Sequence, residues 1–272
     1  LKMTKILRFT VEDVRFPTSK DLTGSDAIHT DPDYSATYVT AYTDDSNLKG
    51  YGIAFTIGKG NDIVAECIKY FFPIFENMNL EDIENDIGKL WYKCVDHSQL
   101  RWLGPEKGAV HMAVAAIFNC LWDLIAKKNK KPLWRFVAES DPEKILSWLT
   151  FKYIEDVLTP DQALKILKDS QNDKKVRIDK ILKEGYPSYT TAAGWLGYSD
   201  EKIVKLCKKY ISMGWKHFKV KVGLDLEADV KRLELIRKTI GDDCHIMVDA
   251  NQQWSVEQSI KHINAYKKFN LL

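Results

Sequence analysis

The sequence lacks the features that would assign it to a disulfide-rich, zinc-binding or membrane-spanning class of protein. Its 272 residues include only five cysteines, which are scattered, odd in number and never spaced as C-x-x-C. This distribution indicates reduced core thiols in a reducing compartment and argues against a thiolate zinc site. No window approaches ~18 uninterrupted apolar residues, so we expect no membrane-spanning helix and no membrane partner.

An excess of charge of one sign is also missing. The 40 lysines and arginines nearly balance the 38 aspartates and glutamates, which leaves a net charge of +2. A charge this small gives no electrostatic argument for a nucleic-acid partner. No G-x-G-x-x-G follows a strand pattern, which disfavours a dinucleotide-binding oxidoreductase. A strand pattern follows the N-terminus at once, so no transit peptide is visible, which favours a cytoplasmic location.

The composition is that of a globular protein, 45% hydrophobic and 29% charged, with length for one large or two ordinary domains. Residues 1–140 carry the patterns of an α+β domain. Alternating Leu7, Phe9 and Val11 predict a half-buried strand. Two further predicted strands complete an antiparallel meander, and three helical stripes follow. Their ranges are 35–43 and 50–58 for the strands, and 63–73, 83–94 and 104–131 for the helices.

The polar segment from Pro17 to Tyr34 is too long for a turn, and we expect it to be a binding loop or lid. Residues 141–272 form the second predicted domain. It begins with a strand-like link over 145–154 and a charged helical insertion at about 157–185. Strands then alternate with helices, which predicts a parallel sheet with right-handed crossovers and three βα units. The strands are expected at 189–193, 217–222 and 245–249, with helices starting at Ser199, Leu226 and Ser255.

Two lysines and an aspartate fall at the ends of the predicted parallel strands. Lys219 and Lys221 are two residues apart and therefore face the same side of a strand, and Asp249 ends the next strand. The carboxyl ends of barrel strands carry the chemistry of such folds. Taken alone, the lysines are more often solvated edge-strand residues and the aspartate a helix cap.

Together these three residues suit one class of reaction. Neighbouring ammonium groups depress each other's pKa, which would prepare one lysine as a base near neutral pH. Asp249 offers the hard oxygen ligand that Mg²⁺ prefers. A lysine base beside a bound metal suits removal of a proton α to a carboxylate, because the metal stabilises the enediolate that forms.

The residues also carry a resemblance. The motif Lys219-x-Lys221 followed by Asp249-Ala250-Asn251 resembles the second- and third-strand motifs of the mandelate racemase branch of the enolase superfamily. Longer segments resemble the L-fuconate dehydratases, and the resemblance covers essentially the whole chain. These segments are Val14–Ser19, His29–Ser35, Gln99–Trp102, Gly104–Gly108 and Trp195–Asp200.

The resemblance implies an N-terminal α+β capping domain followed by a (β/α)₇β barrel. It implies Mg²⁺-dependent dehydration of the sugar acid L-fuconate to 2-keto-3-deoxy-L-fuconate, in a mitochondrial protein. By position, Lys221 matches the base, Lys219 the residue that contacts the substrate carboxylate, and Asp249 the first metal ligand. Asn251 would lie near the metal or the substrate. The loop that would close over the sugar acid contains Gly24, Ser25, Asp26 and Tyr34.

One departure from the family is large. The family's fourth barrel strand opens with Trp-Ile-Glu-Glu-Pro, whereas this sequence ends Phe269-Asn270-Leu271-Leu272. From Tyr186 onward there are 87 residues, against ~250 in a typical complete barrel. We therefore expect an incomplete barrel with unpaired sheet edges, and a truncated form of weak or no activity.

Two alternatives stay open at this point. In the first, the chain is a non-catalytic form that associates through its open barrel edge, for example as a homo-oligomer. In the second, the protein is a racemase or a different acid-sugar dehydratase of the same superfamily.

Overall fold

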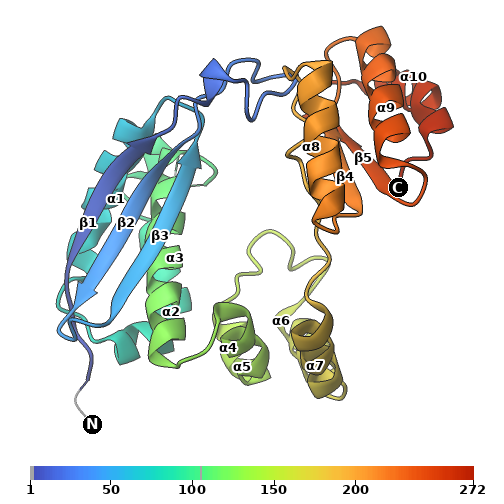
Figure 1. Cartoon of the computed structure of the whole chain (residues 1–272). Helices are drawn as coiled ribbons and strands as arrows, with labels where there is room; N and C mark the ends of the chain where they lie inside the picture. The colour runs from blue at the N-terminus through green and yellow to red at the C-terminus, as the bar shows by residue number, and fades with distance from the viewer. Residues whose placement is uncertain (1–2, 105) are drawn as a thin grey trace. The chain divides into compact units, whose positions relative to one another are not determined.

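A computed structural model describes residues 3–104 and 106–272 (Figure 1). Contacts between Cα atoms divide the chain into two compact units. The cap unit contains Leu1–Arg15 and Ser35–Gly185, and the barrel unit contains Phe16–Tyr34 and Tyr186–Leu272. The predicted lid segment thus makes its contacts within the barrel unit, and residues 141–185 make theirs within the cap unit. The domain boundary at residue 140 stays a prediction.

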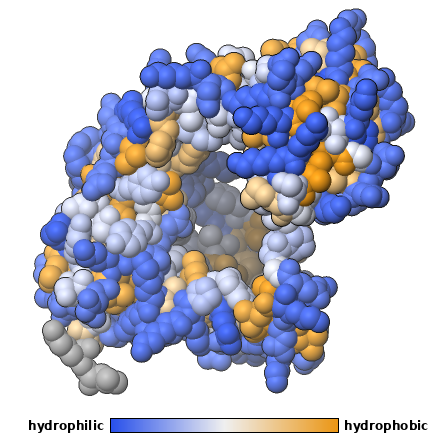
Figure 2. Space-filling view, in the orientation of Figure 1, coloured by the Kyte–Doolittle hydropathy of each residue, from blue (hydrophilic) through white to orange (hydrophobic). Residues whose placement is uncertain are grey.

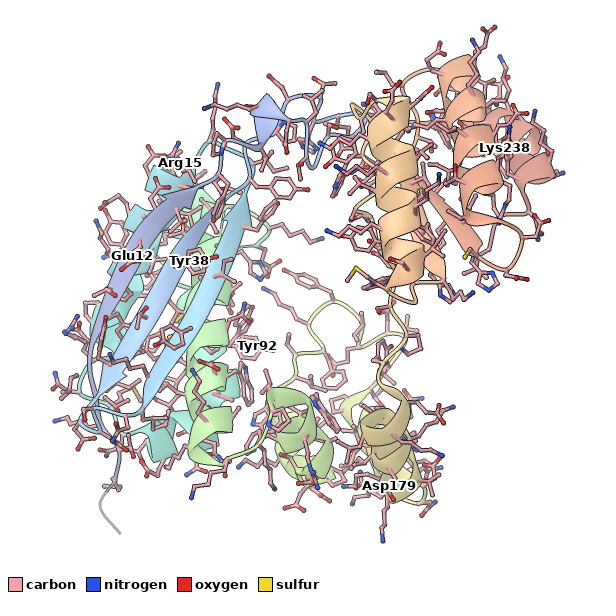
Figure 3. The ribbon with its side chains drawn as sticks, viewed as in Figure 1. Glu12, Arg15, Tyr38, Tyr92, Asp179 and Lys238 are labelled. Atoms are coloured by element: carbon pink, nitrogen blue, oxygen red, sulfur yellow. The ribbon has the colours of Figure 1, made fainter. Side chains whose placement is uncertain are left out.

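The cap unit contains the predicted three-stranded meander. Strands β1 (Ile6–Arg15), β2 (Ser35–Thr43) and β3 (Lys49–Thr56) pair antiparallel in the order β1-β2-β3. Figure 3 shows Glu12 and Tyr38, which face each other in register, on the side of the sheet away from the helices.

The sequence pattern placed Leu7 of β1 on the buried face of the sheet, and this prediction was wrong. Leu7 is 51% exposed and Ile6 is fully buried, because the pairing with β2 shifts register between Ile6 and Arg8. A bulge of this kind moves side chains to the opposite face.

Two long helices, α1 (Asn61–Phe75) and α3 (Ala109–Lys128), cover one face of the cap sheet, and a third, α2 (Leu80–Val95), packs against α3 (Figure 1). Two predictions about them were wrong in detail. The buried stripe of α1 runs through Val64, whereas Ile63 is 58% exposed. Helix α3 begins at Ala109 and not at residue 104, and Pro105 lies outside the described residues.

Helix α3 is the centre of the cap core. By length and composition it is the one described helix that could cross a membrane, but 61% of that stretch is buried inside the protein. It lies so close to β3 that a Cβ on Gly52 would be 1.9 Å from the carbonyl oxygen of Ala116. Glycine at this position therefore permits the sheet and the helix to pack backbone to backbone.

The cap unit ends in four shorter helices, α4 (Leu133–Glu139), α5 (Pro142–Ser147), α6 (Pro160–Asp169) and α7 (Lys174–Glu184). The predicted strand-like link over 145–154 was wrong, because Pro142 starts a helix at a position where proline costs no hydrogen bond. Helices α6 and α7 occupy the charged segment predicted to be helical at about 157–185, and its being an insertion stays a prediction. Thr159 caps α6 in a capping box with Gln162.

The barrel unit contains α8 (Asp200–Ser212), β4 (His217–Lys221), α9 (Leu226–Ile240), β5 (His245–Asp249) and α10 (Val256–Tyr266). The parallel pairing of β4 with β5 confirms the predicted strand–helix alternation. Ser199 and Ser255 cap α8 and α10, as their positions predicted.

The edges of this sheet differ from the prediction. Residues 189–193 do not form a strand and contribute only a parallel bridge between Thr190 and Phe218. On the other side, Leu271 bridges Ile246 in parallel, and the Leu272 amide donates to the Ile246 carbonyl at 2.9 Å. Four short parallel segments therefore lie side by side, with the segments of Thr190 and Leu271 outermost, and the expectation of unpaired sheet edges stays a prediction.

A second core lies between the parallel strands and their helices. It includes Phe218, Val220 and Ile246 from the strands and Leu233 and Ile236 from α9. Burying these side chains removes apolar surface from water, which stabilises the unit. Figure 2 shows mainly hydrophilic side chains over the visible face of each unit, with hydrophobic residues in scattered patches.

Candidate active site

The carboxyl ends of β4 and β5 bring the predicted lysines and aspartate together. Because the two strands are parallel and in register, Lys219 pairs with Met247 and Lys221 with Asp249. The intervening Val220 is 1% exposed and packs into the core. The alternation of a strand therefore directs both lysines to one face and the apolar side chain to the other.

Both ammonium groups bind one carboxylate. Lys221 Nζ lies 2.7 Å and Lys219 Nζ 3.0 Å from Asp249 Oδ2. Lys221 also donates to Asn251 Oδ1 at 2.8 Å. Asn251 has a φ of 51°, a left-handed conformation that asparagine tolerates, and its amide donates to Asp249 Oδ1 at 2.9 Å. We name these four residues the strand-end cluster.

The contacts within the cluster lower the pKa of Asp249 and raise that of Lys219. Burial opposes ionisation of Asp249, but hydrogen bonds from Lys221, the Asn251 amide and Lys219 outweigh burial and hold the pKa of Asp249 well below its usual range. Burial also opposes the charge of Lys219, yet Asp249 and Tyr189 raise its pKa. The predicted depression of the pKa is therefore wrong for Lys219, because Asp249 and Tyr189 together outweigh the effect of burial.

Aromatic side chains form one wall beside Lys221. The Trp195 ring centroid lies 5.8 Å from Lys221 Nζ, a separation at which a cation and an aromatic face attract. Tyr34 meets Trp195 edge to face, with ring centroids 6.3 Å apart. Trp195 thus lies between Lys221 and Tyr34, which was predicted as a substrate contact.

The loop that holds Tyr34 is hydrogen-bonded to two segments of the barrel unit, one that follows the Thr190 bridge and one that follows β5. Ser25 accepts from the Gly197 amide through Oγ at 2.9 Å and from the Leu196 amide through its carbonyl at 3.0 Å. Gln253 Nε2 donates to the Ala27 carbonyl at 2.8 Å. These bonds hold the loop over the barrel unit, where a lid would have to lie.

The other predicted loop residues have structural partners. Asp26 is 6% exposed and accepts from the His29 amide at 2.7 Å and from the Ile28 amide at 2.8 Å. A Cβ on Gly24, which has a φ of 89°, would lie 2.4 Å from the Tyr34 ring. Both residues therefore shape the loop and the position of Tyr34. Their contact with a substrate stays a prediction.

Several residues at this site were not predicted from the sequence. Trp195 appeared only within a resembling segment, and Asp229 and Arg232 were not singled out at all. A signal was present, because 229 and 232 lie one turn before the apolar positions Leu233 and Ile236 on the same helix. Charged residues on a buried stripe indicate a buried polar network.

The metal-binding capacity of the cluster is partial. Mg²⁺ takes oxygen ligands and is often held by one or two carboxylates together with water and substrate oxygens. Asp249 and the Asn251 amide oxygen are ligands of this kind, and both now contact Lys221. Within residues 3–104 and 106–272, no group of three or more His, Cys, Asp or Glu side chains could hold a metal ion. Asp249 and Asn251 therefore fit as part of a magnesium coordination sphere.

Comparison with known proteins places this cluster in a family context. Residues 202–272 match the family described as enolase C-terminal domain-like. Over 269 residues, 98% of this chain and 60% of the relative, the sequence is 48% identical to mitochondrial enolase superfamily member 1 of Xenopus laevis. It is 44% identical to L-galactonate dehydratase of Hypocrea jecorina over 96% of this chain and 59% of that protein. The chain thus spans about 60% of the length of these curated relatives.

Solved structures give the same result. The crystal structure of human mitochondrial enolase superfamily member 1 matches with a TM-score of 0.94 and 45% identity, over 99% of this chain and 62% of that chain. A more distant match, at 20% identity and a TM-score of 0.69 over 99% of this chain and 57% of the other, is an L-talarate/galactarate dehydratase liganded with Mg and L-glucarate. The distant match shows the shared fold alone.

Proposed function

The chain belongs to the enolase superfamily, and from this premise we propose that the protein is a Mg²⁺-dependent sugar-acid dehydratase that acts on L-fuconate. The observation that carries the proposal is the strand-end cluster. Two lysines and one aspartate meet at the carboxyl ends of parallel strands, with Lys221 Nζ 2.7 Å from Asp249 Oδ2. This is the arrangement that proton removal beside a metal-bound carboxylate requires.

The choice of substrate is supported by the chemistry of a named relative. L-Fuconate is L-galactonate without its C6 hydroxyl, and the Hypocrea jecorina relative is named L-galactonate dehydratase. The two acids share their configuration from C2 to C5, where dehydration takes place. We therefore expect L-galactonate to be the second-best substrate.

Lys221 takes the proton from C2 of the sugar acid in this proposal. Its ammonium must first lose a proton, and its two oxygen partners, Asp249 and Asn251, hold Nζ at a fixed place beside Trp195. Lys219 remains protonated and binds the substrate carboxylate, in keeping with its raised pKa. The C2–H bond breaks as Lys221 takes the proton, the C3–O bond breaks as the hydroxyl gains a proton from a general acid and leaves as water, and the enol product tautomerises to the 2-keto-3-deoxy acid.

Asp249 and Asn251 are the residues of this chain that would hold magnesium. When bound, the ion would supply positive charge against the oxygens of the enediolate. Solved L-talarate/galactarate dehydratases of the same fold are liganded with Mg, which supports this cofactor. The relatives named mitochondrial support a mitochondrial location.

The test is a substrate panel assayed on a chimera. Residues 1–272 are joined to the part of the human relative that this chain does not cover, because the two sequences are 45% identical over the shared part. The chimera is incubated with Mg²⁺ and L-fuconate, L-galactonate, D-arabinonate or galactarate, and 2-keto-3-deoxy acids are quantified. We expect turnover with L-fuconate to exceed that with the other acids.

Two controls make the assay specific to the strand-end cluster. Asp249→Asn should abolish turnover, whereas Lys231→Met, which removes an exposed lysine from α9, should leave turnover unchanged. A product with inverted C2 and no loss of water would instead establish a racemase. Turnover of none of the acids by a folded chimera would reject the proposal.

A further inference from the structure

Three polar side chains behind the strand-end cluster form a buried network. Asp229 and Arg232 lie on α9 and are 2% and 8% exposed, and Tyr266 ends α10 and is fully buried. A buried charge is costly unless it is paired and hydrogen-bonded. Each member of this network has such a partner, so the network is a built feature of the barrel unit.

Arg232 joins two backbone segments that carry site residues. Its Nη1 donates to the carbonyl oxygen of Trp195 at 3.1 Å, and its Nη2 donates to the carbonyl oxygen of Lys221. These carbonyls belong to neighbouring segments, the end of β4 and the loop that follows the Thr190 bridge. One planar guanidinium therefore sets the spacing between them.

Asp229 holds the guanidinium and the turn after β4 at the same time. Its Oδ1 lies 3.6 Å from Arg232 Nη2, and its Oδ2 accepts from the Gly223 amide at 2.8 Å. The Tyr266 hydroxyl donates to the same Oδ2 at 3.0 Å. Gly223 has a φ of 116°, so the turn that follows Lys221 depends on a conformation that glycine adopts readily.

We propose that Arg232 is the positioning residue for Lys221. By binding both carbonyls, with Asp229 and Tyr266 fixing its own orientation, Arg232 sets the Trp195 indole against the Lys221 ammonium. The indole then restricts the rotamers of the lysine and keeps water from one side of Nζ. The inference rests on the proposed function only in calling Lys221 the base, whose placement governs the rate of proton transfer.

The test measures the contact between Lys221 and Trp195 in the 272-residue chain. The chain is labelled with 5-fluorotryptophan, and its eight tryptophans give ¹⁹F signals, of which Trp195 is assigned by Trp195→Phe. When Arg232 is present, Lys221→Met should shift the Trp195 signal, because the cation beside the ring is removed. In the Arg232→Lys background, the same substitution should leave the Trp195 signal where it was.

A matched control comes from the same helix. Arg237 also binds backbone carbonyls, those of Phe269 at 2.9 Å and Cys244 at 2.6 Å, but at the opposite end of α9. Arg237→Lys loses the same kind of hydrogen bonds and should reduce the melting temperature by a similar amount. The Lys221-dependent shift of Trp195 should be retained in this variant, which separates positioning from general stability.

The outcomes are distinct. If Trp195 responds to Lys221→Met as strongly in Arg232→Lys as in the wild type, the inference is overturned. Should Arg232→Lys fail to fold, the same comparison is made in Tyr266→Phe, which removes one hydroxyl that orients Asp229. A weakened response there supports the proposal and an unchanged one overturns it. Because the ¹⁹F measurement uses no substrate, it tests the contact between Lys221 and Trp195 even if the proposed dehydratase activity is not found.

Discussion

Lys219, Lys221 and Asp249 were predictable as single residues because a strand converts sequence spacing into geometry. Two lysines at i and i+2 face the same side, and a parallel neighbour places its own end residue beside them. The partners of these residues were not predictable in the same way. Trp195, which follows the Thr190 bridge, and Arg232, on α9, reach Lys221 from other segments, and their contacts depend on how those segments pack against β4.

The titration of Asp249 tests the strand-end cluster. Its pKa is depressed in the folded state, so its contribution to stability is complete above the unfolded value of about 3.9 and is lost as pH falls through the folded value. We expect the Asp249 ¹³Cγ signal to show the carboxylate still ionised below pH ~4. Lys221→Met should raise the Asp249 pKa, and the exposed substitution Lys231→Met should not. Equal Asp249 titration curves in all three proteins would mean that the ion pair is absent in solution.

A glycine beside β4 offers a second test at this scale. A Cβ on Gly194 would lie 2.1 Å from the Lys219 carbonyl oxygen, while the Gly194 carbonyl accepts from the Lys221 amide at 2.8 Å. We expect Gly194→Ala to lower the free energy of unfolding by about 1–3 kcal/mol, since the backbone must move. Urea unfolding measures this. The control is Gly185→Ala, which has open space around its Cβ but a φ of 74°, and which should cost about 1–2 kcal/mol for the left-handed conformation alone.

At the scale of elements, the long periodic segments were predicted well and the short ones were not. The strands of the meander and helices α2, α8, α9 and α10 follow hydrophobic periodicity and capping residues that lie within each element. Residues 189–193 and 145–154 carry apolar runs that are too short to separate a strand from a helix or an extended loop. Tertiary contacts decide them, as when Trp148 after α5 packs against Trp122 with ring centroids 4.9 Å apart.

The contact of β3 with α3 gives a prediction for a whole element. Gly52→Ala places a methyl group against the Ala116 carbonyl and should push the helix from the sheet, at a cost of about 1–3 kcal/mol. Ile53→Val, on the exposed face of the same strand, should change stability by less than about 0.5 kcal/mol. Thermal unfolding followed by circular dichroism compares the two. A Gly52→Ala protein as stable as Ile53→Val would contradict the close packing.

At the scale of the whole molecule, the sequence pattern predicted a cap domain and the start of a barrel, and the resemblance alone implied a loop that closes over the sugar acid. Residues 16–34 lie in the cap by sequence order, yet their hydrogen bonds go to residues such as Gly197 and Leu196 of the barrel unit. The composition of this segment predicts a long polar loop, but its own residues do not predict which part of the chain the loop contacts. The contacts depend on Leu196 and Gly197, which lie more than a hundred residues away in the sequence.

Two separate cores give a prediction at this scale. Phe118 belongs to the cap core and is 4% exposed, and Phe218 belongs to the barrel core and is 2% exposed. Truncation of either to alanine should cost about 3–5 kcal/mol in its own unit. Hydrogen exchange with mass spectrometry should show faster exchange of β4 and β5 in Phe218→Ala and of β2 and α3 in Phe118→Ala. Equal acceleration of both units by each substitution would show one shared cooperative core.

We propose that Lys221 removes the C2 proton of a sugar acid. It is tested most directly by following the loss of that proton from L-fuconate by ¹H NMR in D₂O, with Mg²⁺ and the chimera described above. We expect Lys221→Met to lower the rate by roughly 10²- to 10⁴-fold, the usual contribution of a general base, and Lys231→Met to leave it unchanged. Loss of the C2 proton at the same rate in the folded Lys221→Met chimera would contradict the account.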